Sequence, residues 1–263
     1  MNRVVLVTGA ASGLGWAMAQ RFLAAGDHLV LADRDETLLR KRYTECADSS
    51  RVLAESCDVT DAQQLAALVF ATERRFGRLD ILVNNAGITH RSAAAQTDPA
   101  VLKKVMAVDW QAPVELTLLA LPLLKKSRGL IINIGSMAGW MPVPGRAAYC
   151  AAKSALAQFF EVLRLEVEAD GVDVLMVYPS FLDTPIEQNA LGHDGGPAGH
   201  ARSTVGHIRS AEWMAEKILH AAARRQRWLF PDRLSAFASR LWRLWPSLYL
   251  RLIRRRFAAE LKR

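Results

Sequence analysis

The chain has 263 residues, of which 51% are hydrophobic and 23% are charged, a composition that excludes an intrinsically disordered or fibrous protein. The net charge is +8, but from Arg224 onward there are 12 basic and two acidic residues, while the rest of the chain has 22 basic and 24 acidic residues. The body is therefore nearly neutral, and the basic character belongs to the C-terminal tail.

The three cysteines, Cys46, Cys57 and Cys150, are scattered and odd in number. They predict neither a disulfide framework nor a metal-binding pair, which is typical of a reducing compartment. A first strand is expected almost at the N-terminus, without a charged leader and cleavage site, and no run of about 18 apolar residues indicates a spanning helix. We therefore expect a cytoplasmic protein.

Short apolar segments rich in β-branched residues alternate with longer segments of helical periodicity. In chain order, strands are predicted at residues 4–7, 28–32, 51–54, 79–83, 130–134, 172–177 and 228–230, and helices at residues 14–25, 62–76, 146–169 and 210–224. Most of these strands are apolar throughout, as expected where helices cover both faces. The order predicts the α/β class, with a doubly wound, Rossmann-type parallel sheet flanked by helices on both faces.

We predict one domain over residues 1–231, followed by a basic amphipathic helical appendage over residues 232–263. Within the domain, residues 185–208 are rich in glycine and poor in apolar side chains, which indicates a lid loop. Histidines recur in this loop every seven residues, at His193, His200 and His207. We predict no metal there, because a glycine-rich loop lacks the rigid scaffold and the further ligands that a metal site needs.

The tail places leucines and aromatic residues at helical spacing, with arginines over much of the remaining circumference, and Pro246 predicts a bend. A basic amphipathic segment with tryptophans is typical of peripheral contact with an anionic membrane. The apolar stripe could equally pack on the body or on a second subunit. Nucleic acid is not expected as a partner, because no recognised binding module accompanies the charge.

Glycines follow the first predicted strand, in the segment Thr8-Gly9-Ala10-Ala11-Ser12-Gly13-Leu14-Gly15, which leads into a helix. Glycine at such a turn lets the backbone approach a pyrophosphate, whose charge suits the N–H groups and the positive end of the helix. The position between a first strand and a first helix therefore indicates a dinucleotide site.

Asp33 ends the second predicted strand, about twenty residues beyond these glycines. A carboxylate at that place can accept hydrogen bonds from the ribose hydroxyls of an adenosine, and it would repel a 2′-phosphate. Arg34 follows immediately and could instead pair with such a phosphate, and Asp33 could also be a helix N-cap or turn residue. We expect NAD in preference to NADP.

Tyr149 and Lys153 open a strongly helical segment and lie four residues apart, so they share one helix face. A tyrosine ordinarily titrates near about 10, and a nearby ammonium favours the phenolate, which makes this spacing useful for moving a proton to or from a substrate oxygen. Ser136 follows a predicted buried strand, where its hydroxyl could hold the same oxygen. Alone, a Tyr-x-x-x-Lys pair is ordinary on a helix surface, but with the glycine turn and Ser136 it indicates catalysis.

With these motifs together, the chain resembles a short-chain dehydrogenase/reductase over roughly residues 3–230. The glycine turn matches the family's TGxxxGxG motif, residues 84–87 match its NNAG motif, and Ser136, Tyr149 and Lys153 match its catalytic serine, tyrosine and lysine. Residues 1–231 are then the catalytic domain. The resemblance implies cofactor contacts from Gly9, Ala11, Ser12, Gly13, Leu14, Gly15, Asp33, Arg34, Asp58, Val59, Asn85, Ala86, Gly87, Tyr149, Lys153, Pro179, Leu182 and Thr184.

Two residues depart from the family pattern. Asp109 stands where the family has a catalytic asparagine, whose backbone carbonyl helps to hold a water on the proton path to the lysine. An aspartate keeps that carbonyl, so we count Asp109 among the catalytic residues and expect activity with an altered pH dependence. Ser180 stands where a glycine usually lies, and it should restrict the backbone beside the nicotinamide.

The resemblance implies hydride transfer between a carbinol carbon and C4 of the nicotinamide. Tyr149 is the expected acid/base, Ser136 orients the oxygen, and Lys153 lowers the tyrosine pKa and binds the nicotinamide ribose. A hydrophobic secondary alcohol or ketone is expected as the substrate, since the pocket residues are bulky and apolar, although such residues could also pack the core. The substrate contacts expected are Ser136, Trp140, Met141, Tyr149 and Phe181.

Two classes of function stay open on the sequence alone. The first is an active NAD(P)-dependent oxidoreductase, which the complete set of serine, tyrosine and lysine favours. The second is a non-catalytic dinucleotide-binding scaffold or redox sensor, associated with a membrane or partner through the tail, and Asp109 is the catalytic-site feature that favours it. Because members of the family commonly form dimers or tetramers, a homo-oligomer is expected.

Overall fold

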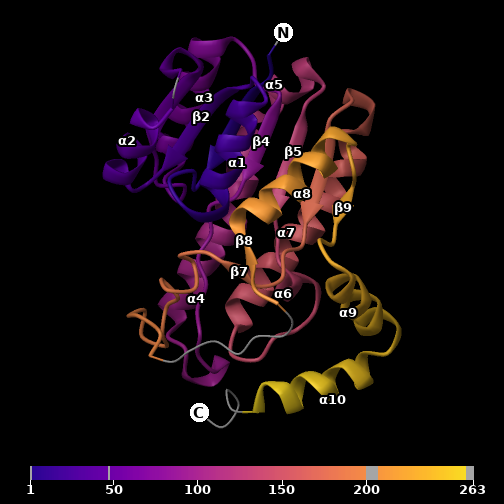
Figure 1. Ribbon diagram of the computed structural model, residues 1–263. Helices are drawn as coiled ribbons and strands as arrows, with labels where there is room; N and C mark the ends of the chain where they lie inside the picture. The colour runs from indigo at the N-terminus through magenta and orange to yellow at the C-terminus, as the bar shows by residue number, and fades with distance from the viewer. Residues whose placement is uncertain (1, 47, 200–206, 259–263) are drawn as a thin grey trace.

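A seven-stranded sheet forms the centre of the protein (Figure 1), and the structure, a computed structural model, describes residues 2–46, 48–199 and 207–258. The strands are β1 (Val4–Thr8), β2 (His28–Asp33), β3 (Val52–Ser56), β4 (Ile81–Asn84), β5 (Leu130–Ile134), β6 (Asp173–Val177) and β9 (Trp228–Leu229). They lie in the order β3-β2-β1-β4-β5-β6-β9, and every neighbouring pair is parallel. The order runs outward in both directions from β1, which places a switch point between β1 and β4.

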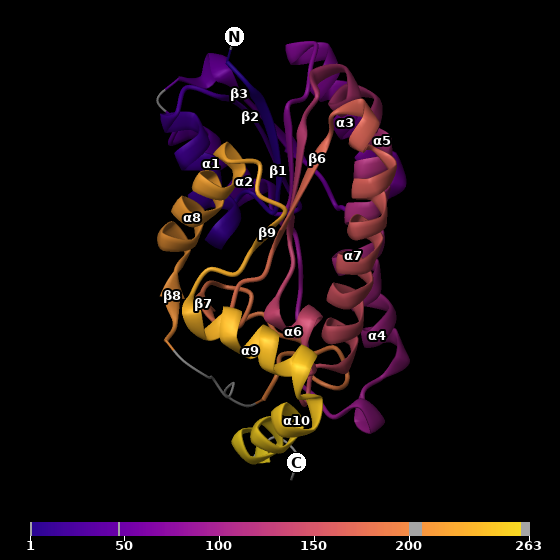
Figure 2. The ribbon, with the colours of Figure 1, turned by 90° about the vertical axis from the view of Figure 1, so that its right-hand side faces the viewer.

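Helices cover both faces of the sheet, as Figure 2 shows edge-on. One face carries α1 (Gly13–Ala24), α2 (Glu36–Thr44) and α8 (Ala211–Ala223), and the other carries α3 (Ala62–Phe76), α5 (Ala112–Ser127) and α7 (Ala147–Glu166). The short helices α4 (Pro99–Met106) and α6 (Met137–Trp140) lie toward the carboxyl ends of the strands. This arrangement confirms the predicted doubly wound, Rossmann-type fold.

The apolar strands bury both of their faces because successive side chains point to opposite sides of the sheet. In β1, Val5 and Val7 pack in one core cluster with Phe22 of α1, while Val4 and Leu6 pack in the other cluster. All five residues of β1 are buried. The continuous apolar pattern of the sequence therefore indicates a central strand between two layers of helices.

The predicted boundaries of these elements differ from the observed ones by no more than three residues, the largest difference being the end of α7 at Glu166. The tail is a helical pair, α9 (Arg233–Leu244) and α10 (Pro246–Arg256), where a single bent segment was predicted. Pro246 stands at the start of α10, where its missing N–H costs no hydrogen bond within the helix. Within the described ranges, no helix is both long and apolar enough to cross a bilayer.

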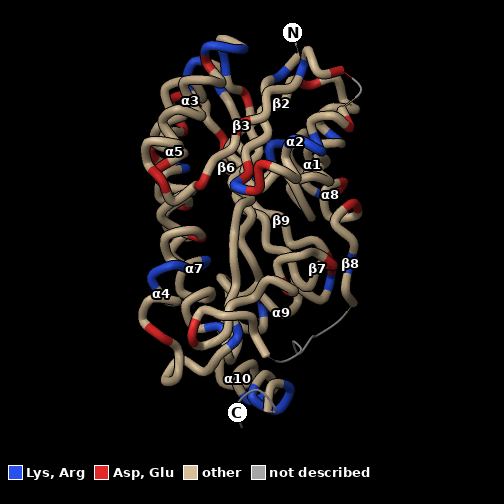
Figure 3. The backbone as a smooth tube through the Cα atoms, turned by 90° about the vertical axis from the view of Figure 1, so that its left-hand side faces the viewer, with Lys and Arg blue, Asp and Glu red and all other residues tan. Residues whose placement is uncertain are grey.

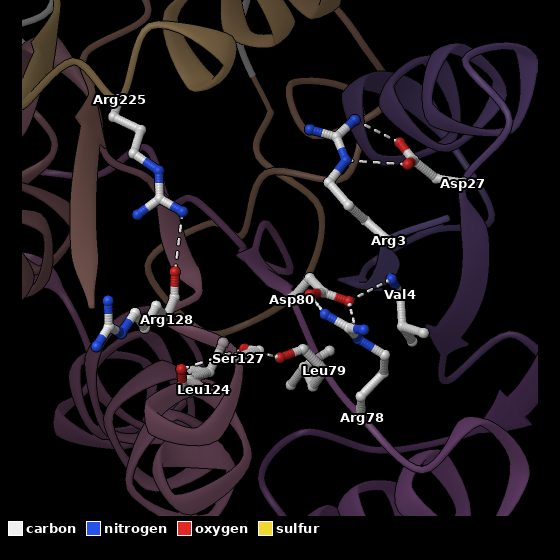
Figure 4. A network of polar contacts seen from close by, with 10 residues as sticks. All are labelled: Arg3, Val4, Asp27, Arg78, Leu79, Asp80, Leu124, Ser127, Arg128 and Arg225. Carbon is white, nitrogen blue, oxygen red and sulfur yellow. Dashed lines mark hydrogen bonds and ion pairs between the residues drawn. The ribbon is translucent and has the colours of Figure 1, made fainter. Parts of the chain in front are cut away.

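Charged side chains form hydrogen bonds and ion pairs at the amino ends of the strands (Figure 4). The buried carboxylate of Asp80 accepts hydrogen bonds from the Val4 N–H (2.8 Å) and from Nε of Arg78 (2.9 Å). Arg3 forms an ion pair with the buried Asp27 at 2.6 Å. Because these contacts lie at the amino edge, the carboxyl edge of the sheet is left for a binding site, as is usual in open α/β sheets.

The segment predicted as a lid loop, residues 185–208, is described over residues 185–199 and 207–208. Its first half is attached to the loop after β4: Leu191 donates its backbone N–H to the Thr89 carbonyl, and Arg91 donates its backbone N–H to the Leu191 carbonyl. Just outside the segment, β7 (Leu182–Asp183) and β8 (Arg209–Ser210) form a small parallel pair. The residues that flank this segment on its two sides therefore lie next to each other.

Candidate active site

A cleft of about 570 Å³ runs along the carboxyl edge of the sheet. Its lining begins at the turn between β1 and α1, passes the ends of β2, β4 and β5, and ends at the inner side of α9 and α10. The residues that line one end are mostly backbone and small side chains, and those at the other end are mostly bulky and apolar. The cleft therefore joins segments that are more than 200 residues apart in the sequence.

The glycine turn is packed too tightly for larger residues. Gly9 has a φ of +64°, and a Cβ there would lie 3.0 Å from the Cα of Ala86. A Cβ on Gly15 would lie 2.1 Å from the carbonyl oxygen of Gly9. Asn85 donates from Nδ2 to the carbonyls of Thr8 (2.8 Å) and Gly9 (3.2 Å), which fixes the turn against the end of β4.

Not every residue of this motif lines the cleft. Gly9, Ser12, Gly13 and Leu14 do, as do the neighbouring Asn85, Ala86 and Gly87. Gly15 lies behind them in the packing of α1 on the turn, and its contact with a cofactor stays a prediction.

The N-terminus of α1 opens directly into the cleft. Its N-cap residue, Ser12, makes no side-chain capping bond, and the first turn of α1 has no acidic residue. The first N–H groups of a helix have no partner within the helix, and they carry its positive partial charge. The residues present therefore fit the pyrophosphate of a dinucleotide, which would lie against Ser12, Gly13 and Leu14.

Asp33 lies at the end of β2 and lines the cleft together with the exposed Arg34. Its carboxylate accepts hydrogen bonds from the N–H groups of Ala11 (2.9 Å) and Asp35 (3.1 Å). Ala11 itself is buried and does not line the cleft, and its carbonyl accepts from Nε of Arg42 (3.0 Å). The peptide of Ala11 thus connects the glycine turn to β2, and its contact with the cofactor stays a prediction.

Asp58 and Val59 line the same end of the cleft, beyond β3. The Asp58 carboxylate accepts hydrogen bonds from the backbone N–H (2.9 Å) and the hydroxyl (2.7 Å) of Thr60, and these bonds lower the pKa of Asp58. Its charge and orientation are therefore fixed by its own turn. These two predicted cofactor contacts thus lie beside Asp33, at the end of the neighbouring strand.

Ser136, Tyr149 and Lys153 meet on one side of the cleft and all line it. Ser136 follows β5 and caps α6, where its hydroxyl accepts the N–H of Ala138 (3.1 Å). Tyr149 and Lys153 lie one turn apart on α7, with Nζ of the lysine 5.8 Å from the centroid of the tyrosine ring. The buried Nζ donates to the carbonyl of Ile134 at the end of β5 (3.1 Å), which fixes the helix against the strand.

The electrostatics of Tyr149 differ from the prediction. Burial raises the pKa of Tyr149 above its ordinary value, the charge of Asp109 raises it further, and a hydrogen bond with Ser136 opposes both effects. The expected lowering of this pKa by Lys153 is therefore corrected for the protein by itself. The ammonium of Lys153 instead donates to the carbonyl of Ile134 and lies 3.9 Å from Oδ2 of Asp109.

Asp109 lies behind the catalytic side chains, in the π-helical segment Ala107–Gln111, and does not line the cleft. It is fully buried, and Oδ1 accepts the N–H of Ile88 (2.8 Å). Oδ2 lies 3.9 Å from Nζ of Lys153 and has no hydrogen-bond partner among the described residues. Burial raises the pKa of Asp109 from 3.8 to about 6, although the charge of Lys153 opposes this. Asp109 therefore lies behind Lys153, and its catalytic role stays a prediction.

The segment predicted to clamp the nicotinamide lies beside the catalytic residues. Pro179, Leu182 and Thr184 line the cleft, as expected. The backbone of Ser180, which replaces the usual glycine, is not in the left-handed region, so a side chain is tolerated there. Its hydroxyl lies 3.4 Å from Oδ2 of Asp232, the N-cap of α9, and so connects this segment to the tail.

Of the predicted substrate contacts, Met141 and Phe181 line the apolar end of the cleft. Trp140 does not. It packs edge-on against Tyr178 and Phe230, with ring centroids 5.2 and 5.4 Å away, and its indole N–H donates to a backbone carbonyl of α9 (3.3 Å). The tail therefore covers one side of the partly buried Trp140, and its contact with a substrate stays a prediction.

Several cleft residues were missed from the sequence. Arg146 lines the cleft one turn before Tyr149, and it forms an ion pair with Glu187 of the lid at 3.4 Å. Arg146 could have been predicted from the sequence, because it lies three residues before Tyr149. No motif near Glu187 indicates a place in the cleft. The inner side of the tail also lines the apolar end, through Leu234, Ser235, Ala238, Tyr249, Ile253 and Phe257.

Among the residues that the structure describes, no group of three His, Cys, Asp or Glu side chains could hold a metal ion. His193 and His207 are exposed, and His200 lies outside the described residues. The three cysteines are free.

Comparison with known proteins agrees with this fold. The family model for short chain dehydrogenases matches residues 3–194. Dehydrogenase/reductase SDR family member 7B of Bos taurus is 34% identical over 99% of this chain and 83% of its own length. 11-beta-hydroxysteroid dehydrogenase A of Sesamum indicum is 36% identical over 74% of this chain and 56% of its own length.

Solved structures give the same result. A short-chain dehydrogenase from Streptomyces avermitilis superposes with a TM-score of 0.81 at 28% identity, covering 100% of this chain and 97% of that one. A 3-ketoacyl-(acyl-carrier-protein) reductase from Brucella melitensis, solved with NADH, has a TM-score of 0.74 at 27% identity and covers 84% and 90%. The chain belongs to the short-chain dehydrogenase/reductase family, and it is an oxidoreductase with a nucleotide-binding Rossmann fold.

Proposed function

We propose that this protein interconverts a secondary alcohol and a ketone on a hydrophobic small molecule, with NAD as the hydride carrier. The observation that carries the proposal is the meeting of Ser136, Tyr149 and Lys153 on one wall of a cleft that begins at the N-terminus of α1. A hydroxyl, a phenol and an ammonium placed together at a dinucleotide cleft suit proton transfer to and from an oxygen.

Each of these side chains has a distinct part in the oxidation of an alcohol. Ser136 accepts or donates a hydrogen bond at the substrate oxygen and so orients it. Tyr149 takes the hydroxyl proton, and Lys153 holds the ribose beside it while compensating the phenolate charge. A bound nicotinamide supplies the acceptor for the hydride at its C4. Reduction of a ketone uses the same groups in reverse, with Tyr149 as the acid.

The apolar end of the cleft supports a hydrophobic substrate. Met141, Val143, Phe181, Ile253 and Phe257 line it, and burial of apolar surface would provide most of the binding energy there. The relatives include a protein named as a hydroxysteroid dehydrogenase and one named as a 3-ketoacyl reductase, which supports a substrate with a large apolar body.

Replacing Tyr149 tests the proposed reaction. Tyr149→Phe removes the phenol oxygen, and with it the proton carrier and the hydrogen bond with Ser136, so we expect turnover to fall about a thousandfold while NADH binding is kept. Turnover is followed through nicotinamide absorbance with a panel of apolar alcohols and ketones, and binding through NADH fluorescence. Tyr43→Phe on α2, outside the cleft lining, is the control. Equal turnover of the two variants would exclude Tyr149 as the acid/base.

The preference for NAD depends on Asp33, whose carboxylate lines the cleft at the end of β2. Asp33→Ser removes the charge that would repel a 2′-phosphate, so the ratio of kcat/KM with NAD to kcat/KM with NADP should fall by about tenfold or more. Asp170→Ser, at an exposed site outside the cleft lining, should leave the ratio unchanged. A wild-type preference for NADP would contradict the proposal.

The alternative of a non-catalytic scaffold or redox sensor makes an opposite prediction. NADH would bind, but no alcohol or ketone of the panel would be turned over by the wild type, and Tyr149→Phe would change nothing. We prefer catalysis to this alternative because Ser136, Tyr149 and Lys153 line the same cleft, an arrangement that a scaffold does not require.

A further inference from the structure

The first tail helix, α9, buries serines and exposes large apolar side chains. The residues of α9 that it buries against the body are Ser235 and Ser239, which are 3% and 6% exposed. Its exposed side includes Phe237 (62%) and Leu244 (65%), followed by Trp245 (61%). A helix on the surface of a globular protein usually does the opposite. The outward side of α9 is therefore shaped for an apolar partner.

The second tail helix continues the same surface. Its inward side carries Tyr249 and Phe257, which are buried, and the hydroxyl of Tyr249 donates to the carbonyl of Pro142 (3.1 Å). Its outward side exposes leucines, at Leu248, Leu250 and Leu252. These leucines and the exposed apolar residues of α9 lie on two successive helices at one end of the molecule (Figure 1), and together they make up the tail surface. Exposed apolar patches of this kind mark interaction sites.

The charges on this surface have a single sign. From residue 233 to residue 256 there are seven arginines and no aspartate or glutamate, and all seven arginines are exposed. Figure 3 shows this for α10, whose backbone carries the blue of basic residues and none of the red of acidic ones. An apolar surface surrounded by arginines is complementary to an anionic, apolar partner, because the long arginine side chains can reach charged groups while their stems pack on hydrocarbon.

The surface is also connected to the cleft. Leu234 is 48% exposed on α9 and at the same time lines the apolar end of the cleft. Ile253 lines the cleft from α10 between the exposed Leu252 and Arg254. The two helices therefore have the cleft on one side and the apolar, basic surface on the other.

We propose that α9 and α10 dock the protein on an anionic lipid bilayer, with Phe237, Leu244, Trp245, Leu248 and Leu252 buried among the acyl chains and the arginines at the phosphates. Tryptophan and arginine are the residues expected where a helix lies in a membrane interface. A second copy of this chain fits less well, because a two-fold contact would place seven arginines opposite seven others without a carboxylate. The proposal does not depend on catalysis.

Flotation of the full-length protein with lipid vesicles tests this docking. Vesicles are made of phosphatidylcholine alone or with about one third phosphatidylglycerol, at about 0.05 and 0.5 M salt. We expect the wild type to float with the anionic vesicles at low salt, at least about tenfold more than with neutral vesicles, and to be partly released at high salt. No flotation with anionic vesicles would overturn the proposal.

A pair of matched variants identifies the surface. Phe237→Glu with Trp245→Glu changes two outward residues that make no contact with the cleft, and flotation should fall at least about tenfold. The control is Phe70→Glu with Leu165→Glu, since these residues are equally exposed on the body (63% and 74%), and it should float like the wild type. Unchanged NADH binding and melting temperature show that each variant is folded.

Two results would assign the surface to something else. Equal flotation of the two double variants would mean that the tail surface does not carry the binding. A wild-type dimer in light scattering that becomes a monomer in Phe237→Glu with Trp245→Glu, without flotation of the wild type, would assign the surface to a second copy of the chain and overturn the proposal.

Discussion

Asp109 combines complete burial with an incomplete set of hydrogen bonds. Oδ1 accepts the N–H of Ile88, whereas Oδ2 lies 3.9 Å from Nζ of Lys153. The family has an asparagine here, whose neutral amide would carry no charge into this site. The carboxylate is therefore a titratable group beside Lys153, and burial raises the pKa of Asp109 to about 6.

This raised pKa predicts a dependence of stability on pH. The folded state binds the proton more tightly than the unfolded state, so Asp109 contributes stability below about pH 4 that is lost as the pH rises through about 6. Asp109→Asn lacks the titration. Between about pH 4 and pH 7 its free energy of unfolding should therefore gain up to about 3 kcal/mol relative to the wild type, as measured by urea denaturation.

The exposed Glu168 provides the control, since Glu168→Gln should follow the wild-type pH dependence. Parallel curves for Asp109→Asn and the wild type would mean that Asp109 titrates normally. The same variant should also lose any step near pH 6 in the pH profile of kcat, if Asp109 acts on Tyr149 through its charge.

At the scale of elements, the lid is attached to the catalytic helix by a cluster of charges. Arg91 and Arg146 are 9% and 5% exposed, and both reach the carboxylate of Glu187, at 3.8 and 3.4 Å. Arg91 also donates to the backbone carbonyl of Glu187 (2.9 Å). Arg146 is the N-cap residue of α7, three residues before Tyr149, so this contact joins Glu187 to the helix that carries Tyr149.

Removing the carboxylate of this cluster tests the attachment. Glu187→Gln leaves two buried guanidinium groups without that charge, so we expect the free energy of unfolding to fall by about 2–3 kcal/mol and KM for the substrate to rise. Asp183→Asn, at an exposed position four residues earlier, should change neither quantity. A loss of stability equal to that of Asp183→Asn would show that the ion pairs contribute nothing.

At the scale of the whole molecule, the cleft has two halves of different origin. The half at the glycine turn belongs to the segment that matches the family model, residues 3–194. The apolar half is completed by α9 and α10, which lie beyond that segment. Figure 2 shows α9 in front of α6, with α10 below it. Cofactor binding and substrate binding should therefore respond separately to changes in the tail.

Phe257 tests this separation, because it is 1% exposed and lines the apolar half. Phe257→Ala removes a buried ring, so we expect a loss of about 2–4 kcal/mol in stability and a KM for an apolar substrate raised about tenfold, with the KM for NAD unchanged within about twofold. Phe237→Ala, on the exposed side of α9, is the control. A parallel rise in both KM values would show that the tail supports the whole cleft.

The sequence alone predicted the sheet, its flanking helices and the proximity of Tyr149 to Lys153, because these follow from local periodicity. A strand buried on both faces is apolar throughout, and two residues four apart share a helix face whatever surrounds them. The glycine turn was equally readable, since Gly9 and Gly15 are positions where a side chain would collide with the backbone. The family motifs extended this to Ser136, which lies on a different element.

The tertiary structure decided what depends on segments distant in the sequence. Arg146 and Glu187 are 41 residues apart in the sequence but in contact in the fold. Trp140 contacts α9, a helix that begins about ninety residues later. The tail pattern predicted amphipathic helices, but not that α9 would bury serines and expose Phe237. Contacts of this kind carry no local periodicity, because they are fixed by which surfaces the packed sheet leaves uncovered.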